Sequence, residues 1–200
     1  RKSQPGTQPK LVLLDCSFDN ISFNTVLMNN QDSACQAVNY LARAGHRKIG
    51  YLKGNVRIRN FLGRERGYEL GMRMNGLPIE KKYQFEVPPS IAGAYEEMDK
   101  LLSAGPELPT AFFADNDMVA LGCMQALQKH NYSIPADISI IGFDDISFCE
   151  VFAPGLTTIR VHKKELGKMA VRRLVDIIEN RRKTEVCMQL CNDLVKRASV

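Results

Sequence analysis

The sequence has 200 residues, of which 44% are hydrophobic and 24% charged, with a formal net charge of +5 and a pI of about 8.9. This composition predicts a soluble globular protein with room for one or two compact domains. It excludes a membrane protein, because no apolar run approaches the length of a membrane span. The opening segment RKSQPGTQPK lacks the apolar stretch of a signal peptide, so we expect a cytoplasmic protein with no membrane partner.

The basic residues and the cysteines indicate no site of their own. Basic residues lie in small groups such as Arg47-Lys48 and Arg181-Arg182-Lys183, which are typical of solvated helix faces and ends. The six cysteines form no C-x-x-C pair, so reduced thiols explain them better than disulfides or zinc. We expect no metal and no cofactor.

Strands and helices alternate along the first half of the chain. Short apolar runs predict strands and a 3.6-residue apolar period predicts helices. In chain order, the segments that read as regular structure are a strand at 10–15, a possible strand at 26–28, a helix at 32–44, a strand at 48–54, a helix at 60–75, a possible strand at 83–87 and a helix at 92–103.

The second half continues the same alternation. The segments are a strand at 111–114, a helix that follows directly over 118–127, a strand at 138–143, an extended segment at 156–161, an amphipathic helix at 163–180 and an extended segment at 187–196. Alternating strands and helices predict an α/β fold with mostly parallel sheets.

Polar residues stand where four of these strands end. The ends are Asp15, Lys53-Gly54, Asp115-Asn116-Asp117 and Asp144-Asp145. Ligands of open parallel sheets lie outside the carboxyl ends of the strands, so these residues point to a single crevice. Taken alone, the Asp115–Asp117 turn fits a ligand site and a helix N-cap equally well, and Asn116 or Asp117 would provide that cap.

The residue types at this crevice suit a polar, uncharged small molecule. Carboxylates and amides bind hydroxyl groups, and the Arg64 guanidinium, near the start of a helix, can bridge two neighbouring oxygens. Phe113 could present an apolar face to a sugar ring. Each of these residues has an equally good structural interpretation: Arg64 as an arginine on the helix surface, and Phe113 as an aromatic residue of the core.

The motifs of common enzymes are absent. The sequence has no G-x-G-x-x-G, no G-x-x-x-x-G-K-[ST], no G-x-S-x-G and no H-E-x-x-H, and its three histidines are dispersed. Gly63, Gly67 and Gly71 recur every four residues, which indicates close helix packing rather than catalysis. We therefore expect that the protein is not an enzyme.

Several segments together resemble the LacI/GalR family of transcription regulators. The matching segments are AGHRKIG (44–50), RERGY (64–68), PTAFFADNDMVALG (109–122), IPADISIIGFDD (134–145) and LTTI (156–159). They occur in the family's order and spacing from Pro9 onward. The resemblance implies a two-lobed, periplasmic-binding-protein-like effector domain with a ligand cleft between the lobes.

The resemblance and the strand ends give six candidate ligand-binding residues: Asn30, Arg64, Phe113, Asn116, Asp117 and Asp144. The resemblance implies that Arg64, Asn116 and Asp144 grip the effector. It places Phe113 where one family member stacks its ligand, and Asn30 beside the cleft.

The resemblance also implies a division of the chain. Residues 1–28 and 161–184 would form part of an N-terminal lobe, and residues 29–160 and 185–200 a C-terminal lobe. The crossings near Asn29, Val161 and Thr184 would act as hinges. We expect the first lobe to be incomplete in this chain and the helix-turn-helix domain of the family to be missing from it.

We therefore expect the ligand-sensing and dimerisation core of a LacI/GalR-type regulator. Its partners would be a sugar or sugar derivative as effector, operator DNA through the missing N-terminal domain, and a second copy of itself. Two alternatives stay open. One is a periplasmic sugar-binding transport protein, which a signal peptide would support, and the other is an α/β enzyme acting on a sugar phosphate, which would need a catalytic pair in the cleft.

Overall fold

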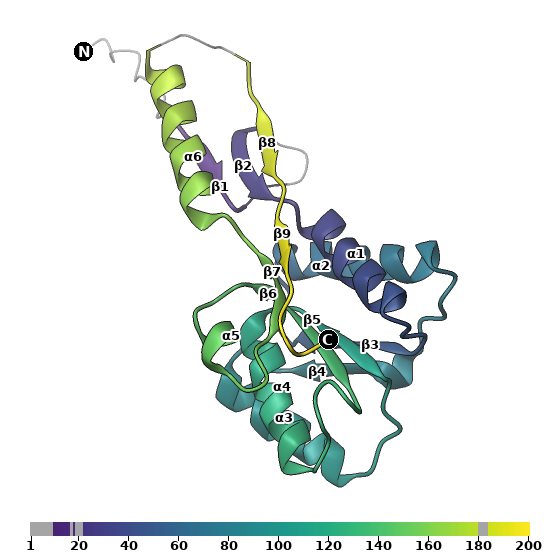
Figure 1. Ribbon diagram of the computed structural model, residues 1–200. Coiled ribbons are helices and arrows are strands. Elements are labelled where there is room, and N and C mark those ends of the chain that lie inside the picture. The colour runs from purple at the N-terminus through teal and green to yellow at the C-terminus, as the bar shows by residue number, and fades with distance from the viewer. Residues whose placement is uncertain (1–9, 17, 19–21, 180–183) are drawn as a thin grey trace, which may run out of the picture. The chain divides into compact units, whose positions relative to one another are not determined.

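The computed structural model describes residues 10–16, 18, 22–179 and 184–200 (Figure 1). Contacts within the chain divide it into two units. Unit 1 runs up to Asn29 and continues over His162–Cys191, and unit 2 contains Asn30–Val161 and Asn192–Val200. The basic group at 181–183 and the expected helix end at 180 lie outside the described residues.

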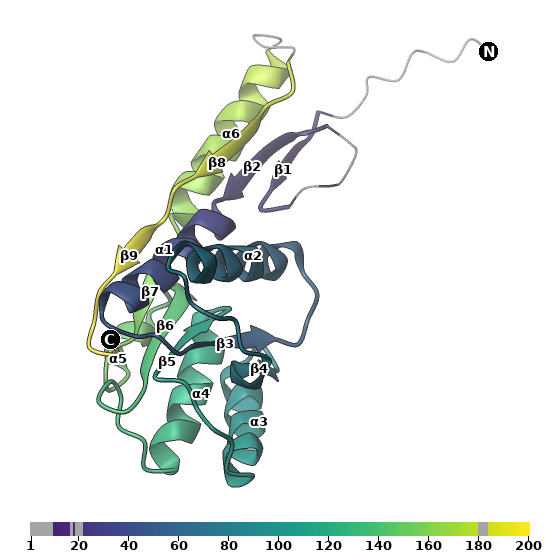
Figure 2. The same ribbon diagram turned by 90° about the vertical axis from the view of Figure 1, so that its right-hand side faces the viewer.

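Unit 2 is a three-layer α/β unit. Its helical elements are α1 (Asn30–Arg43), α2 (Arg59–Met74), the 3-10 turn η1 (Lys81–Tyr83), α3 (Ile91–Ser103), α4 (Asp117–Lys129) and α5 (Phe148–Val151). Its strands are β3 (Ile49–Gly54), β4 (Gln84–Val87), β5 (Ala111–Ala114), β6 (Ser139–Asp144), β7 (Thr157–Arg160) and β9 (Asp193–Val195). The strand order is β4-β3-β5-β6-β7-β9, and only β9 runs antiparallel to its neighbour. Helices α1 and α2 cover one face of this sheet, and α3 and α4 cover the other (Figure 2).

The local sequence explains these elements. The AFFA run of β5 is fully buried because the strand is central and has helices on both faces. The side chain of Ser90 caps α3 by accepting a hydrogen bond from the Gly93 amide at 3.2 Å. Gly45, with a φ of +103°, ends α1 in a backbone conformation that glycine adopts most easily.

Glycines set the close contact between α1 and α2. A Cβ atom at Gly67 would lie 2.2 Å from the carbonyl oxygen of Gln31, and one at Gly71 would lie 2.7 Å from Cβ of Val38. No real side chain fits at such distances, so the expectation that these glycines serve packing is confirmed.

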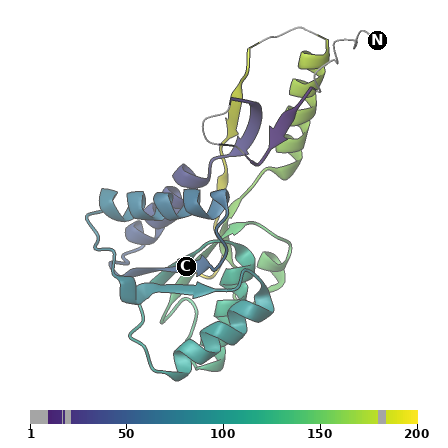
Figure 3. The ribbon, with the colours of Figure 1, turned by 180° about the vertical axis from the view of Figure 1, so that it is seen from behind.

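Unit 1 contains a three-stranded parallel sheet in the order β1-β2-β8. Its elements are β1 (Val12–Leu14), β2 (Asn24–Met28), α6 (Lys163–Ile178) and β8 (Cys187–Leu190). Helix α6 packs against β1 and β2 (Figure 3). The buried Arg173 of α6 ties the unit together, because its Nε donates to Asn24 Oδ1 at 2.6 Å and its Nη2 to the Thr184 carbonyl.

The prediction of an α/β fold with mostly parallel sheets is confirmed. The extended segment expected at 187–196 is in fact two strands: β8 pairs with β2 in unit 1, and β9 pairs with β7 in unit 2. The third crossing between the two units therefore follows Cys191. The sequence analysis expected it earlier, near Thr184. Within the described ranges, no helix has both the length and the apolar character needed to cross a bilayer.

Candidate functional site

Arg64 is the centre of a polar cluster in unit 2. It lies in α2, and its side chain is only 3% exposed. Its Nε donates to Oδ1 of Asn30, the first residue of α1, at 2.9 Å. Its Nη2 lies 3.2 Å from Oδ1 of Asp144 at the end of β6, and its Nη1 donates to the backbone carbonyl of Asp115 after β5. We call Asn30, Arg64, Phe143 and Asp144 the Arg64 cluster.

Aromatic rings and amides fix the orientation of the guanidinium. Its Cζ lies 3.8 Å from the ring centroid of Phe143 and 5.7 Å from that of Phe61, and such contacts are attractive for a cation. The amide of Asn30 is held in turn, because its Nδ2 donates to Asn60 Oδ1 at 3.2 Å. The arrangement presents a planar donor fork, a carboxylate and an amide together, which are the groups that bind neighbouring hydroxyls.

Asp115 connects the Arg64 cluster to a cavity. The cavity has a volume of about 410 Å3 and lies beside the carboxyl end of β3, with Tyr51, Lys53, Phe61 and Asp115 in its lining. The Asp115 carboxylate accepts hydrogen bonds from the Tyr51 hydroxyl and, at 2.7 Å, from the Gly54 amide. Burial raises the pKa of Asp115 to about 6, and these two hydrogen bonds oppose the shift. Among the described residues, no group of three or more His, Cys, Asp or Glu side chains could hold a metal ion.

Asn116 is the N-cap of α4. Its Oδ1 accepts a hydrogen bond from the Val119 amide at 2.9 Å, which fits one of the two N-caps expected from the sequence. The side chain is half-buried at the end of β5, next to the carbonyl that Arg64 binds. The cap uses only the amide oxygen of Asn116.

The contacts that hold Phe113 and Asp117 are made with residues outside the Arg64 cluster. Phe113 is fully buried and stacks on Tyr51 with 5.5 Å between ring centroids, while Tyr51 stacks on Tyr68 at 4.9 Å. Phe113 is therefore a core aromatic in this structure. Asp117 is also fully buried, and its carboxylate accepts hydrogen bonds from the Thr158 hydroxyl and, at 2.9 Å, from the Ile146 amide.

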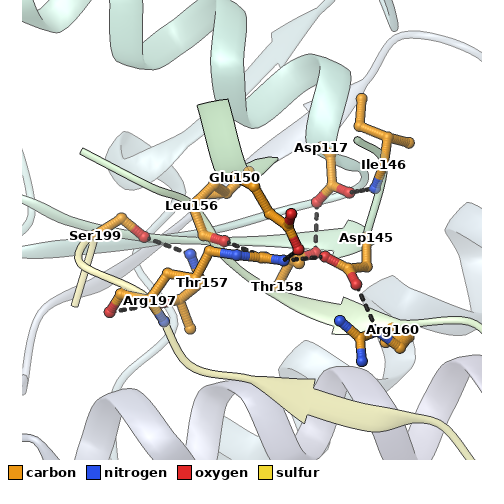
Figure 4. Close-up of polar contacts among 10 residues, drawn as sticks. All are labelled: Asp117, Asp145, Ile146, Glu150, Leu156, Thr157, Thr158, Arg160, Arg197 and Ser199. Carbon is orange, nitrogen blue, oxygen red and sulfur yellow. Dashed lines mark hydrogen bonds and ion pairs between the residues drawn. The ribbon is translucent and has the colours of Figure 1, made fainter. Parts of the chain in front are cut away.

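Asp145 was not among the candidate residues, yet it anchors the loop that follows β6. Its Oδ2 lies 2.6 Å from Nε of Arg160 in β7, and its Oδ1 lies 2.8 Å from Nη2 of Arg197 near the C-terminus (Figure 4). Burial raises the pKa of Asp145, but the hydrogen bonds from the two arginines outweigh it and the net shift is downward. The sequence alone identifies Asp145 only as a carboxylate next to Asp144. Its two arginine partners cannot be predicted from the sequence, because they lie 15 and 52 residues away.

The fold and the site define a class of protein. A parallel α/β unit with a cluster of polar side chains at its strand ends is typical of small-molecule binding domains. Residues 38–200 match the family described as periplasmic binding protein-like domain. The chain belongs to this family, as the effector-binding domain of a LacI/GalR-type regulator.

Two curated relatives illustrate the similarity. The Ribose operon repressor of Haemophilus influenzae is 34% identical over 170 residues, which cover 85% of this chain and 51% of the relative. The probable HTH-type transcriptional repressor ExuR of Bacillus subtilis is 29% identical over 168 residues, which cover 84% of this chain and 50% of the relative. The chain spans about half the length of the curated relatives it matches. Both relatives are named as repressors, and neither name is that of an enzyme.

Solved structures agree with this assignment. A regulatory protein of the LacI family from Chloroflexus aggregans superposes with a TM-score of 0.86 at 32% identity, covering 94% of this chain and 67% of that one. A LacI family transcriptional regulator from Enterococcus faecium, solved with bound ribose, superposes with a TM-score of 0.82 at 28% identity, covering 94% of this chain and 69% of that one.

Proposed function

We propose that this chain is the ligand-sensing core of a DNA-binding transcriptional regulator, and that the Arg64 cluster binds its effector. The observation that carries the proposal is a buried guanidinium that contacts three segments of unit 2: α1 through Asn30, the β5 end through the Asp115 carbonyl, and the β6 end through Asp144. A ligand that exchanges hydrogen bonds with this guanidinium changes the contacts of all three segments at once.

The chemistry of the cluster favours a sugar or sugar derivative. The Arg64 fork can donate to two adjacent oxygens, and the Asp144 carboxylate can accept from hydroxyl groups. Asn116 adds an amide at the neighbouring strand end. The ribose bound to the Enterococcus faecium structure and the name of the Haemophilus influenzae relative support a sugar as the effector class.

The partners of the whole protein follow from the same proposal. Effector binding would favour one conformation of the protein, and its differential affinity for two conformations would change operator binding. A helix-turn-helix segment outside these 200 residues would contact the DNA, and two DNA half-sites call for a homodimer in the cytoplasm. The names of the curated relatives favour this reading over a periplasmic transport protein. Sedimentation velocity checks the homodimer, and a monomer at micromolar concentration would contradict it.

Ligand-induced thermal stabilisation tests the site. At a hundredfold excess over Kd a ligand stabilises the native state by about 2.7 kcal/mol, which raises the Tm of a protein of this size by roughly 5–10 °C. We expect one member of a panel of aldoses, D-ribose included, sugar acids and sugar phosphates to produce such a shift. Arg64→Ala should abolish the shift and leave the far-UV circular dichroism spectrum unchanged.

Arg66→Ala is the matched control, because Arg66 is an exposed arginine of the same helix. It should keep the full shift. Arg64→Lys should keep the charge but lose most of the shift, because lysine cannot reproduce the planar fork. Full stabilisation of Arg64→Ala by the same sugar would remove Arg64 from the site.

A further inference from the structure

The loop that carries Asp144 has an unfavourable backbone conformation. Asp144 has a φ of +110° and Asp145 a φ of +50°, both in the region that residues with a Cβ rarely adopt. Two such residues in succession persist only where surrounding contacts hold them. Asp144 is the residue whose carboxylate meets Arg64, so whatever holds this loop also sets the position of that carboxylate.

Contacts on both sides of the loop hold it. On one side, Asp145 accepts from Arg160 and Arg197, and its side chain is only 8% exposed. On the other side, the Ile146 amide donates to Asp117 at 2.9 Å. Figure 4 shows the Asp145 carboxylate with its contacts to Arg160 and Arg197, and the Ile146 amide with its contact to Asp117.

The two arginines are themselves anchored to different segments. Arg160 lies in β7, where it is the register partner of Asp144, and it stands two residues before the chain enters unit 1 at His162. Arg197 follows β9, after the chain has returned to unit 2, and its Nη1 donates to the Leu156 carbonyl at 2.8 Å. Its Nη2 also lies 3.2 Å from the exposed Glu150.

We propose that Asp145 is a positioning residue for the effector site, which holds Asp144 against Arg64 by clamping the β6 loop to Arg160 and Arg197. The inference rests on the proposed function, since it assigns Asp145 a role in that same site. Asp145 does not touch the effector. It determines the geometry of the residue that does, and it joins the effector-binding loop to two segments that lead to and from unit 1.

The test uses the ligand-free 15N-labelled chain, so it does not depend on knowing the effector. Asp145→Asn keeps the shape of the side chain but removes the charge, and one of its two arginine contacts then meets an amide NH2. We expect the Arg64 Nε–H signal in the 1H–15N spectrum to move and the amide signal of Asp144 to shift. Glu150→Gln touches the same arginine at an exposed position, and it should leave both signals in place.

A thermal double-mutant cycle gives the second readout. Asp144→Asn should lower the Tm of the wild type by about 5 °C, because a buried arginine loses its carboxylate partner. In the Asp145→Asn background the same change should cost less than about 2 °C, because contacts that depend on one another are not additive. A residue with a merely structural role would give additive losses and an unmoved Arg64 signal, and that result would overturn the proposal.

Arg160→Gln covers the case in which Asp145→Asn does not fold. Arg160 is 46% exposed, so its removal should be tolerated, and it should move the Arg64 signal in the same direction by a smaller amount. An unmoved signal in Arg160→Gln would then overturn the clamp. If no sugar stabilises the wild type, the proposed function fails while the positioning of Asp144 by Asp145 can still be observed.

Discussion

The carboxylate of Asp117 is a charged group in a buried setting, and its titration makes stability depend on pH. Burial raises its pKa from the ordinary value of 3.8 to about 6, against the hydrogen bonds from Thr158 and Ile146. The folded protein therefore holds this proton more tightly than the unfolded chain does. The stability that protonation contributes is fully present below pH 3.8 and is lost as the pH rises through about 6.

Asp117→Asn should remove this dependence. Asparagine stays neutral, can accept from the Ile146 amide and can donate to the Thr158 hydroxyl. The free energy of unfolding of the variant, relative to wild type, should rise between pH 4 and pH 7 by about 2–3 kcal/mol, since each pKa unit corresponds to about 1.4 kcal/mol. Urea denaturation at pH 4, 5.5 and 7 measures it.

The control is Asp137→Asn. Asp137 is an exposed carboxylate that also accepts a backbone hydrogen bond, from the Ser133 amide at 2.7 Å. The pH-dependent change in Asp117→Asn should exceed the change in this control. A constant difference between wild type and Asp117→Asn over the whole range would show that Asp117 titrates alike in the folded and unfolded chains.

The sequence predicted where the strands end, but it did not predict the direction in which each side chain points. Arg64, Asn30 and Asp144 were named as candidates and lie in contact. Phe113 was named beside them, yet it belongs to a stack of buried rings. Whether a side chain near a strand end faces the crevice or a covering helix depends on strand alternation and on which helix packs there. Asp145 was noted only as part of a strand end, and its contacts with Arg160 and Arg197 could not be predicted because these arginines are distant in sequence.

The pair of helices α1 and α2 depends on backbone contact. Gly67 of α2 lies directly on α1, where an added Cβ would meet the Gln31 carbonyl at 2.2 Å and Cβ of Ala34 at 2.7 Å. Neither neighbour is the flexible end of a side chain, so the helices would have to move apart. Because Asn30 begins α1 and Arg64 lies one turn before Gly67, the same displacement would stretch the hydrogen bond between them.

Gly67→Ala should therefore destabilise the protein by about 1–3 kcal/mol and weaken effector binding. The same substitution in α6, Gly167→Ala, is the matched control, because nothing lies within 4 Å of a Cβ there. It should stabilise by about 0.5–1 kcal/mol, since alanine is the better helix former. Guanidinium denaturation measures the free energy of unfolding of both variants, which should fall for Gly67→Ala and rise for Gly167→Ala. Equal effects in both helices would mean that propensity, not helix contact, governs Gly67.

Element types were readable from the sequence wherever the periodicity ran over a whole helix or a buried strand. The four-residue spacing of the glycines on α2 even indicated a close helix contact. The short α5 was missed because four residues give no period to read. The break between β8 and β9 was missed because nothing in that segment marks where one strand leaves a sheet and the next joins another.

The path of the whole chain makes unit 2 discontinuous. The chain leaves unit 2 after Val161 and returns at Asn192, and its last residues complete the edge of the six-stranded sheet. Asn192 donates to the Ser33 hydroxyl of α1 at 2.9 Å on this return. The stability of unit 2 therefore depends on residues that a reading of Asn30–Val161 alone would leave out.

Ser199 makes three such links to β6 and to Thr157 of β7. Its hydroxyl accepts from the Thr157 amide at 2.8 Å and donates to the Ile140 carbonyl at 2.6 Å, while its own carbonyl accepts from the Ile140 amide at 2.9 Å. The side chain is fully buried, so one hydroxyl satisfies backbone groups of both β6 and β7. Alanine would leave the Thr157 amide buried without this acceptor.

Ser199→Ala should cost about 1–3 kcal/mol, which lowers the Tm by roughly 3–10 °C for a protein of this size. Ser103→Ala is the control, because that exposed hydroxyl donates to the Asp99 carbonyl of its own helix, and its Tm should stay within about 1 °C of wild type. Differential scanning calorimetry measures both. If Ser199→Ala melted with the wild type, the Ser199 hydroxyl would not be needed to hold β6 and β7, and the returning segment would act through the β9–β7 pairing instead.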